Sequence, residues 1–124
     1  MTQKDLDRRL SNYIRIHRTN AGLSQGELGS AIGYRNEQAV ARHERFYVTP
    51  PLAVAIRYAI VFRVPVTDLF AGLSDDMAAD VEARLTQLEA KLGQRSARDR
   101  NALATARKLM WLSQRKNPEY SMGV

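Results

Sequence analysis

Apolar residues recur at intervals of three and four along the N-terminal part of the chain, which is the spacing of one face of a helix. The first such segment covers residues 4–20. Its apolar face carries Leu6, Leu10, Tyr13, Ile14 and His17. Thr2 is a candidate cap at its start, and Ala21-Gly22 ends it. The pattern therefore predicts a long first helix, in which His17 is a packed side chain without chemistry of its own.

A short helix, a tight turn and a second short helix are predicted next. Ser24 is a good N-cap, and Glu27 three residues later can close a capping box. The apolar face of the first of these helices consists of Leu28, Ala31 and Ile32. Gly33 stops it, and the second short helix starts near Glu37 and includes residues 41–45. Two short helices joined in this way form a rigid corner, and the second one can lie in the major groove of DNA.

A further helix follows Thr49-Pro50-Pro51, where the threonine hydroxyl is the predicted cap and a proline suits the first turn. Its apolar residues are numerous enough to line the inside of a small bundle: Leu52, Ala55, Ile56, Ala59, Ile60 and either Phe62 or Val61. Residues 64–70 close the domain. The composition changes after residues 71–72, and we take this change as the domain boundary.

The segment after this boundary has a narrower apolar stripe. The stripe consists of Ala78, Val81, Leu85, Leu88 and Leu92, which are three and four residues apart in a heptad pattern. Three heptads are short for a free-standing coiled coil, so the stripe needs a partner. The partner is either the same helix of a second chain or the helix that follows. Gly93 breaks the heptad helix, and a final helix, with Ser96 and Asp99 as a second capping box, ends near Lys116.

Charge is unevenly distributed over this tail. Residues 73–92 contain two basic and five acidic side chains, whereas residues 93–117 contain seven basic side chains and one acidic. Opposite signs on consecutive helices favour a hairpin between them, and a basic helix beside a DNA-binding domain can equally contact phosphate. The sequence leaves both possibilities open. We expect Trp111 of the final helix to be buried.

Composition limits the classes of function. The formal net charge of +6 favours polyanionic partners, and the absence of cysteine excludes disulfides, thiol catalysis and cysteine-ligated zinc. No run of about 18 apolar residues and no secretory leader is present, so we expect a cytoplasmic protein without a membrane span. The pattern holds no nucleophile with a base, no metal-ligand spacing and no phosphate-binding glycine loop. We therefore expect neither an enzyme nor a cofactor.

Residues 6–70 resemble the lambda-repressor-like helix-turn-helix regulators, also called the Cro or XRE type. The resemblance is carried by residues 18–25, Glu27-Leu28, Ile32-Gly33, 42–45, 50–52 and 64–70. It implies an all-α protein with a five-helix DNA-binding domain at residues 1–72. One or two C-terminal helices would follow as a dimerisation or interaction tail at residues 73–117, before a flexible end at 118–124.

The resemblance also assigns roles at the predicted DNA interface. The base-reading residues would be Glu37, Gln38, Ala41 and Arg42, while Val40 and His43 face inward. Gln25 would clamp the DNA backbone, and the other phosphate-binding candidates are Arg35, Asn36, Arg45 and Thr49. Family members often pair an arginine and a glutamate at the positions of Arg18 and Glu44, which predicts a partly buried salt bridge that fixes the recognition helix.

Two departures from the family pattern fall on this interface. Between Gly33 and Val40 the chain is one residue longer than the common pattern, which affects the mapping of the specificity residues. Phe46 occupies a position where the family usually has glycine, so the loop after the recognition helix could follow a different path. Gly26 and Gly29 also lower the helix propensity of the preceding helix by about 1 kcal/mol each.

The sequence thus predicts a regulator that binds specific double-stranded DNA, as a homodimeric repressor on a palindromic operator. The predicted dimerisation residues are Val81, Leu85, Leu88 and Leu92. The alternative is an antitoxin-like or accessory DNA-binding protein whose helical tail binds a protein partner.

Overall fold

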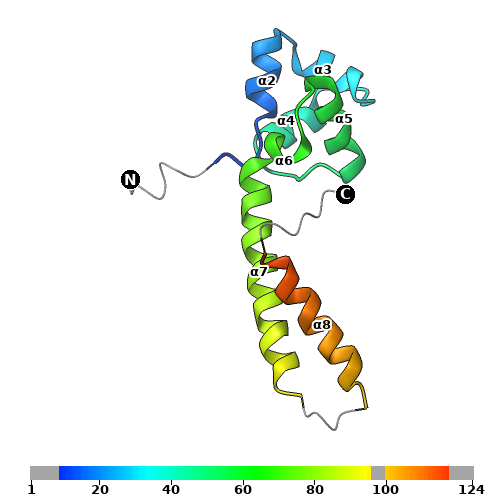
Figure 1. Cartoon of the computed structure of the whole chain (residues 1–124). Coiled ribbons are helices and arrows are strands. Elements are labelled where there is room, and N and C mark those ends of the chain that lie inside the picture. Colours follow the sequence, from blue (N-terminus) through cyan, green and yellow to red (C-terminus); the bar gives the residue numbers. More distant parts are fainter. Residues whose placement is uncertain (1–8, 96–99, 118–124) are drawn as a thin grey trace. The chain divides into compact units, whose positions relative to one another are not determined.

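The computed structural model describes residues 9–95 and 100–117, and all regular structure within them is helical (Figure 1). The all-α prediction is therefore confirmed for this part of the chain. The chain divides into two compact units, Met1–Met77 and Ala78–Val124, so the division falls a few residues after the predicted boundary at residue 72. No helix in the described ranges has the length and apolar character needed to cross a membrane.

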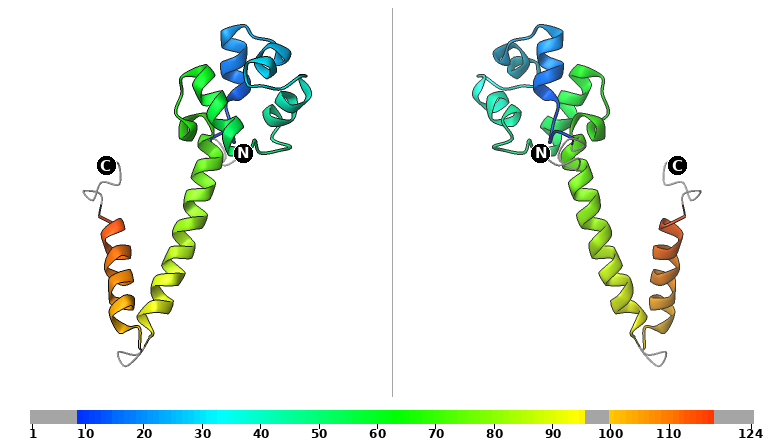
Figure 2. Two further views of the ribbon diagram at one scale, coloured as in Figure 1. Left: turned by 90° about the vertical axis from the view of Figure 1, so that its right-hand side faces the viewer. Right: turned by 90° about the vertical axis from the view of Figure 1, so that its left-hand side faces the viewer.

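The first unit consists of short helices around one core (Figure 2). The helices are α2 (Ile14–Ala21), α3 (Gln25–Ala31), α4 (Gln38–Glu44), α5 (Leu52–Phe62), α6 (Val66–Leu69) and the first turns of α7 (Ala71–Gly93). The buried core is formed by Ile14, Leu28, Ile32, Val40, Ala55, Tyr58, Leu69 and Phe70. Every helix from α2 to α6 contributes to this core, so burial against its neighbours stabilises helices that are too short to be stable alone.

The predicted long first helix is wrong in its described part, because α2 begins only at Ile14 and residues 9–13 are not helical. The side chain of Asn12 accepts a hydrogen bond from the Ile14 N–H at 3.1 Å, which competes with helix formation before that point. The N–H of Tyr13 donates to the Leu69 carbonyl, and the N–H of Gly72 donates to the Leu10 carbonyl, both at 2.8 Å. In residues 9–13, backbone hydrogen bonds to residues far away in the sequence thus replace the hydrogen bonds of a helix. The predicted Thr2 cap lies outside the described residues.

The start and end of α3 agree with the prediction. The Ser24 hydroxyl accepts from the Glu27 N–H at 3.0 Å, and the Glu27 carboxylate accepts from the Ser24 N–H at 2.8 Å. These hydrogen bonds lower the pKa of Glu27. Gly33 adopts a φ of 97°, a left-handed conformation that favours glycine at a helix end. Of the predicted apolar face, Leu28 and Ile32 are buried, but Ala31 is exposed.

The prediction for α5 is wrong in two respects. The helix follows Pro51 and has no side-chain cap, so Thr49 does not cap it. Three residues expected inside, Leu52, Ile56 and Ile60, are 72%, 42% and 68% exposed. The core side of α5 instead carries Ala55 and Tyr58. Because α5 has apolar residues all around, its sequence does not single out the inner side.

The second unit pairs the rest of α7 with α8 (Ala102–Arg115). Arg115 and Lys116 form ion pairs with Glu82 and Glu89, each at 2.6 Å, so α8 folds back onto α7 of the same chain. The hydrogen bond from Arg115 also lowers the pKa of Glu82. Gly93 is the last residue of α7, as expected. The predicted capping box at residues 96 and 99 lies outside the described residues.

Trp111 is 48% exposed, which contradicts its expected burial. The guanidinium of Arg115 lies 5.6 Å from the centre of the indole ring. Among the described residues of this unit, the buried ones are Leu92, Thr105 and Leu112. Two paired helices have too little shared surface to bury a large indole as well, because each helix is covered on one side only.

Candidate nucleic-acid interface

The exposed face of α4 carries the predicted base-reading residues. Gln38 and Arg42 are exposed and Ala41 is half-buried, whereas Val40 and His43 are 0% and 3% exposed. The outward residues and Arg45 follow the i, i+3, i+4, i+7 spacing of one helical face. The predicted inward orientation of Val40 and His43 is confirmed. The exposed side chains on this face of α4 are therefore free to form hydrogen bonds with a ligand on the solvent side.

The α4 helix begins at Gln38, one residue after the predicted start near Glu37, and Glu37 is its N-cap residue. The side-chain oxygen of Asn36 accepts a hydrogen bond from the Gln38 N–H at 3.0 Å, and Glu37 makes no side-chain cap. A Cβ on Gly29 would lie 3.0 Å from the Asn36 carbonyl oxygen, so the small residue lets α3 approach this turn. A larger side chain at Gly29 would crowd the Asn36 carbonyl, so glycine suits this close approach. The side-chain oxygen of Asn36 serves this turn, while its NH2 group can still donate, so the phosphate contact stays a prediction.

A cluster of polar side chains braces α4 from behind. Arg18 pairs with Glu44 through two hydrogen bonds of 2.6 and 3.2 Å, and their side chains are 14% and 3% exposed. The predicted Arg18–Glu44 salt bridge is confirmed. The Arg18 guanidinium also donates to the Leu23 carbonyl at 2.9 Å, which ties the end of α2 to the start of α3. The cluster joins three helices and limits rotation of α4 about its axis.

Gln25 belongs to the same cluster. Its side-chain amide donates to the Glu44 carboxylate at 3.1 Å. An amide nitrogen carries two N–H groups, so the second can donate to another acceptor. Gln25 is half-buried at the first turn of α3, which holds its side chain in one place. Glu44, which pairs with Arg18, therefore also positions Gln25, the predicted phosphate clamp.

A buried polar network that the sequence did not predict also holds the C-terminal end of α4, next to Glu44. Nδ1 of His43 lies 2.8 Å from the Tyr58 hydroxyl, and the Asn12 amide donates to the His43 carbonyl at 2.9 Å. Burial lowers the pKa of His43 and raises the pKa of Tyr58, so the imidazole stays neutral near pH 7. A tyrosine on α5, where all residues except Arg57 and Tyr58 are apolar, was the available signal, because a buried phenol needs a polar partner.

The loop after α4 keeps the backbone path expected for glycine although it carries Phe46. Phe46 has a φ of 65°. Its N–H donates to the His43 carbonyl at 3.2 Å, and the N–H of Tyr47 donates to the Arg42 carbonyl at 3.1 Å. This pair of hydrogen bonds is a Schellman ending, which requires the left-handed conformation at this position. Arg35, Arg45 and Thr49, the remaining phosphate candidates, are all exposed beside α4.

The four predicted dimerisation residues do not form one open seam. Leu92 is 3% exposed and Leu85 is half-buried, whereas Val81 and Leu88 are 48% and 43% exposed. Because α8 of the same chain folds back onto α7, it takes up part of the stripe. The prediction of a continuous α7 seam for a second chain is therefore wrong at Leu92.

Comparisons of the chain with protein-family models, with curated proteins and with solved structures found no match. The resemblance to the lambda-repressor-like family therefore depends on the residues of this chain alone.

Proposed function

We propose that the first unit is a lambda-repressor-like helix-turn-helix domain and that the protein is a sequence-specific regulator that binds double-stranded DNA. The proposal depends on one observation: one side of α4 is open to solvent, and the opposite side is held by polar contacts to other helices. Its outer side offers Gln38 and Arg42 to solvent, while Glu44 on its inner side is held by Arg18 and Gln25. A recognition helix needs such a fixed backbone, because hydrogen bonds to base edges tolerate little misplacement.

The outward side chains of α4 and of its N-cap residue Glu37 suit groups in the major groove. Arg42 suits the two acceptors of guanine, Gln38 suits adenine, and Glu37 accepts from the cytosine amino group. The half-buried Ala41 suits the methyl group of thymine. Arg45 and Arg35 are the flanking cations that would contact phosphate and set the orientation of the helix. A good bidentate pair discriminates against the wrong base by about 1–3 kcal/mol.

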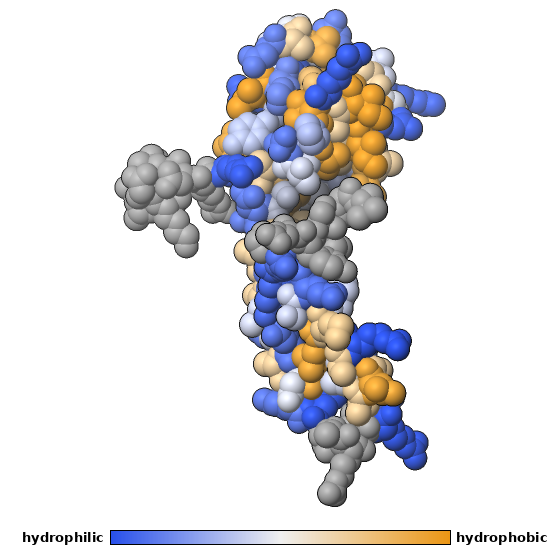
Figure 3. All heavy atoms as spheres, viewed as in Figure 1, coloured by the Kyte–Doolittle hydropathy of each residue, from blue (hydrophilic) through white to orange (hydrophobic). Residues whose placement is uncertain are grey.

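A homodimer on a palindromic operator belongs to the same proposal. The α5 stripe, defined as Leu52, Ile56 and Ile60, is the better surface for a second chain, because its members are 72%, 42% and 68% exposed one turn apart. Figure 3 shows apolar side chains gathered on this part of the first unit. Contiguous exposed apolar surface of this kind marks an interaction site. Dimerisation would place two recognition helices about 34 Å apart on DNA.

Selection of binding sites from random duplex DNA tests the proposal. We expect one enriched palindrome, whose affinity falls steeply with salt because phosphate contacts release counterions. Arg42→Ala should relax base choice at one position of each half-site, and Gln25→Ala should weaken all sequences alike. Lys91→Ala removes a cation from the second unit and is the matched control. Failure to enrich any sequence over random duplex would refute sequence-specific binding.

The dimer surface has its own test by sedimentation. Ile56→Glu should yield a monomer, whereas Val81→Glu on α7 should leave the dimer intact. If Val81→Glu yields a monomer and Ile56→Glu does not, the dimer interface lies on α7 instead of α5.

A second candidate function is an accessory DNA-binding protein whose tail binds a protein partner. The specific observation in its favour is the open apolar surface of the second unit, where Val81, Leu88 and Trp111 are all more than 40% exposed. Copurification of a second polypeptide in fixed proportion, lost in Leu88→Asp, would favour this candidate over a self-contained repressor.

A further inference from the structure

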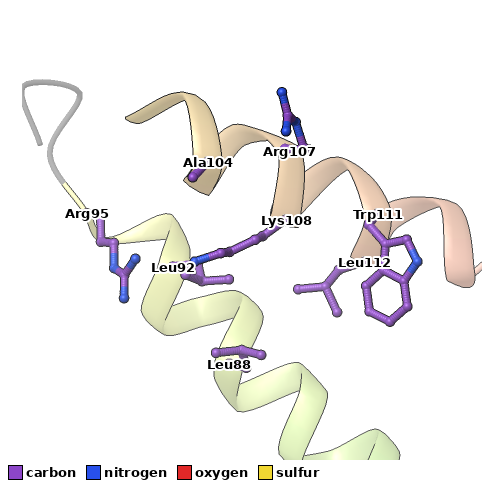
Figure 4. Close-up of a pocket in the computed structure, with 8 residues that line it drawn as sticks. All are labelled: Leu88, Leu92, Arg95, Ala104, Arg107, Lys108, Trp111 and Leu112. Carbon is purple, nitrogen blue, oxygen red and sulfur yellow. The ribbon is translucent and has the colours of Figure 1, made fainter. Parts of the chain in front are cut away.

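The second unit contains a groove that the proposed binding of DNA by the first unit does not use. It lies between α7 and α8 and has a volume of about 690 Å³ (Figure 4). Its apolar floor is formed by Leu88, Leu92, Trp111 and Leu112. Small-molecule sites typically have volumes of about 300–1,000 Å³ and mostly apolar walls with a few polar groups. The groove therefore has the size and lining of a small-molecule site.

Among the described residues that line this groove, all the charged side chains are positive. Arg95, Arg107 and Lys108 line the groove, and no described lining residue carries a carboxylate. Figure 4 shows the Lys108 side chain crossing from α8 to lie beside Leu92, whereas Arg107 points away from α7. Arg95 extends from the end of α7 and is 3.5 Å from the Thr105 hydroxyl. Lys108 and Arg95 are thus the cations best placed to meet an anionic group above the floor.

A second copy of the chain is a poor occupant of this groove. A two-fold symmetric contact pairs the same surface on both chains. Such a contact would bring Arg95, Arg107 and Lys108 of both chains into one interface, and this accumulation of like charges is costly. The acidic residues Glu82 and Glu89 cannot offset this cost, because they already pair with Arg115 and Lys116 of the same hairpin.

We propose that this groove binds a free hydrophobic anion, such as a medium-chain fatty acid or an aryl carboxylate. The acyl chain or ring lies on the leucines and Trp111, and the carboxylate lies near the Lys108 ammonium and the Arg95 guanidinium. Burial of the apolar body supplies most of the affinity, since burying apolar surface is worth about 25 cal/mol per Å². The cations select an anionic head group. This site is independent of DNA binding by the first unit.

Fluorescence of Trp111 gives a direct test, because it is the one tryptophan of the chain and lines the groove. The full-length protein is titrated with laurate below its critical micelle concentration and, separately, with dodecylammonium, which has the same chain length and the opposite charge. We expect a saturable change in Trp111 emission with laurate and a much weaker response to dodecylammonium. Equal responses to both, or no response to either, would overturn the proposal.

Substitutions at the rim test the role of charge. Lys108→Gln should weaken laurate binding about two- to fivefold, as expected for a partly exposed charge pair. Lys108→Glu should move the preference towards dodecylammonium. Lys91→Gln removes a cation from the same hairpin outside the groove lining and should leave the affinity unchanged. Equal losses in the Lys108→Gln and Lys91→Gln variants would show only a general effect of net charge and would overturn the proposal.

Other occupants give different results in the same measurements. If a second chain fills the groove, Trp111 emission will change with protein concentration in step with sedimentation, and laurate will compete with self-association. That outcome would assign the groove to an interface between copies. Circular dichroism of each variant separates loss of binding from loss of helix, and Lys108 is exposed, so its substitution removes no packed side chain.

Discussion

The two units of the chain are stabilised in different ways. In the first unit, helices of four to eleven residues surround a core in which Ile14, Leu28, Val40, Tyr58 and Leu69 are fully buried. In the second unit, a longer pair of helices buries few side chains and is joined at its surface by ion pairs. Burial of apolar surface is strong and insensitive to salt, whereas surface ion pairs are weak and screened. The first unit is therefore suited to present a fixed surface, and the second to adapt to an occupant.

The largest expected effect is the loss of a core side chain in the first unit. Leu28→Ala should lower the free energy of unfolding by about 4 kcal/mol, because it leaves a cavity around a residue that is 0% exposed. Leu88→Ala in the second unit should cost about 1 kcal/mol or less, since Leu88 is already 43% exposed. Hydrogen exchange followed separately in each unit measures both. Equal losses in the two units would contradict the idea that the first unit depends more strongly on buried apolar side chains.

The next effect concerns the ion pair behind α4. Glu44→Ala should destabilise the first unit by about 3 kcal/mol, because it leaves the Arg18 guanidinium largely buried without its partner. Urea unfolding measures this loss. The surface pair Arg84–Asp80 of α7 is the matched control, and Asp80→Ala should change stability very little. A small effect of Glu44→Ala would mean that Arg18 finds another acceptor.

Acid should act on the first unit through His43. Burial lowers the pKa of His43 in the folded state, so between this value and the unfolded value of about 6.5 the unfolded chain binds more protons. Stability is therefore complete above about pH 6.5 and falls as the pH decreases through this window. Urea unfolding at pH 7.5 and 5.5 should show the loss. His43→Gln should remove most of this dependence, and an unchanged dependence would exclude His43 as its source.

The smallest expected effect is that of salt, and it should be confined to the second unit. At about 1 M salt the screening length falls to about 3 Å, so the exposed Arg115–Glu82 pair should weaken and amide exchange in α8 should accelerate. Exchange in α4 should change little, because Glu44 is 3% exposed at its side chain. Glu82→Gln should mimic the effect of salt on α8. Faster exchange in α4 at high salt would contradict the buried character of the Arg18–Glu44 pair.

Short sequence patterns correctly predicted those features of the first unit that depend only on residues close together in the chain. Ser24 and Glu27 lie three residues apart and form their capping box without help from distant segments. Gly33 ends α3 because its own backbone allows a positive φ. The Arg18–Glu44 pair was predicted through the family resemblance, and no local rule would have joined residues 26 positions apart.

The parts that could not be predicted are those in which distant groups compete with a local pattern. Helical spacing continued through Leu10, yet the Leu10 carbonyl accepts its hydrogen bond from Gly72. On α5 the apolar residues surround the helix, and only the position of Tyr58 opposite His43 shows which side is inside. At the start of α4, the Asn36 side chain formed the turn, so the helix began one residue later than predicted.

The sequence by itself determined the helical class, the ends of α3 and α7, and the residues available to α4, because propensity and capping act over a few residues. The tertiary structure decided which side of each helix is buried, how the tail folds back, and which polar groups brace α4. These outcomes depend on desolvation and on contacts between residues far apart in the chain, and no local pattern records them.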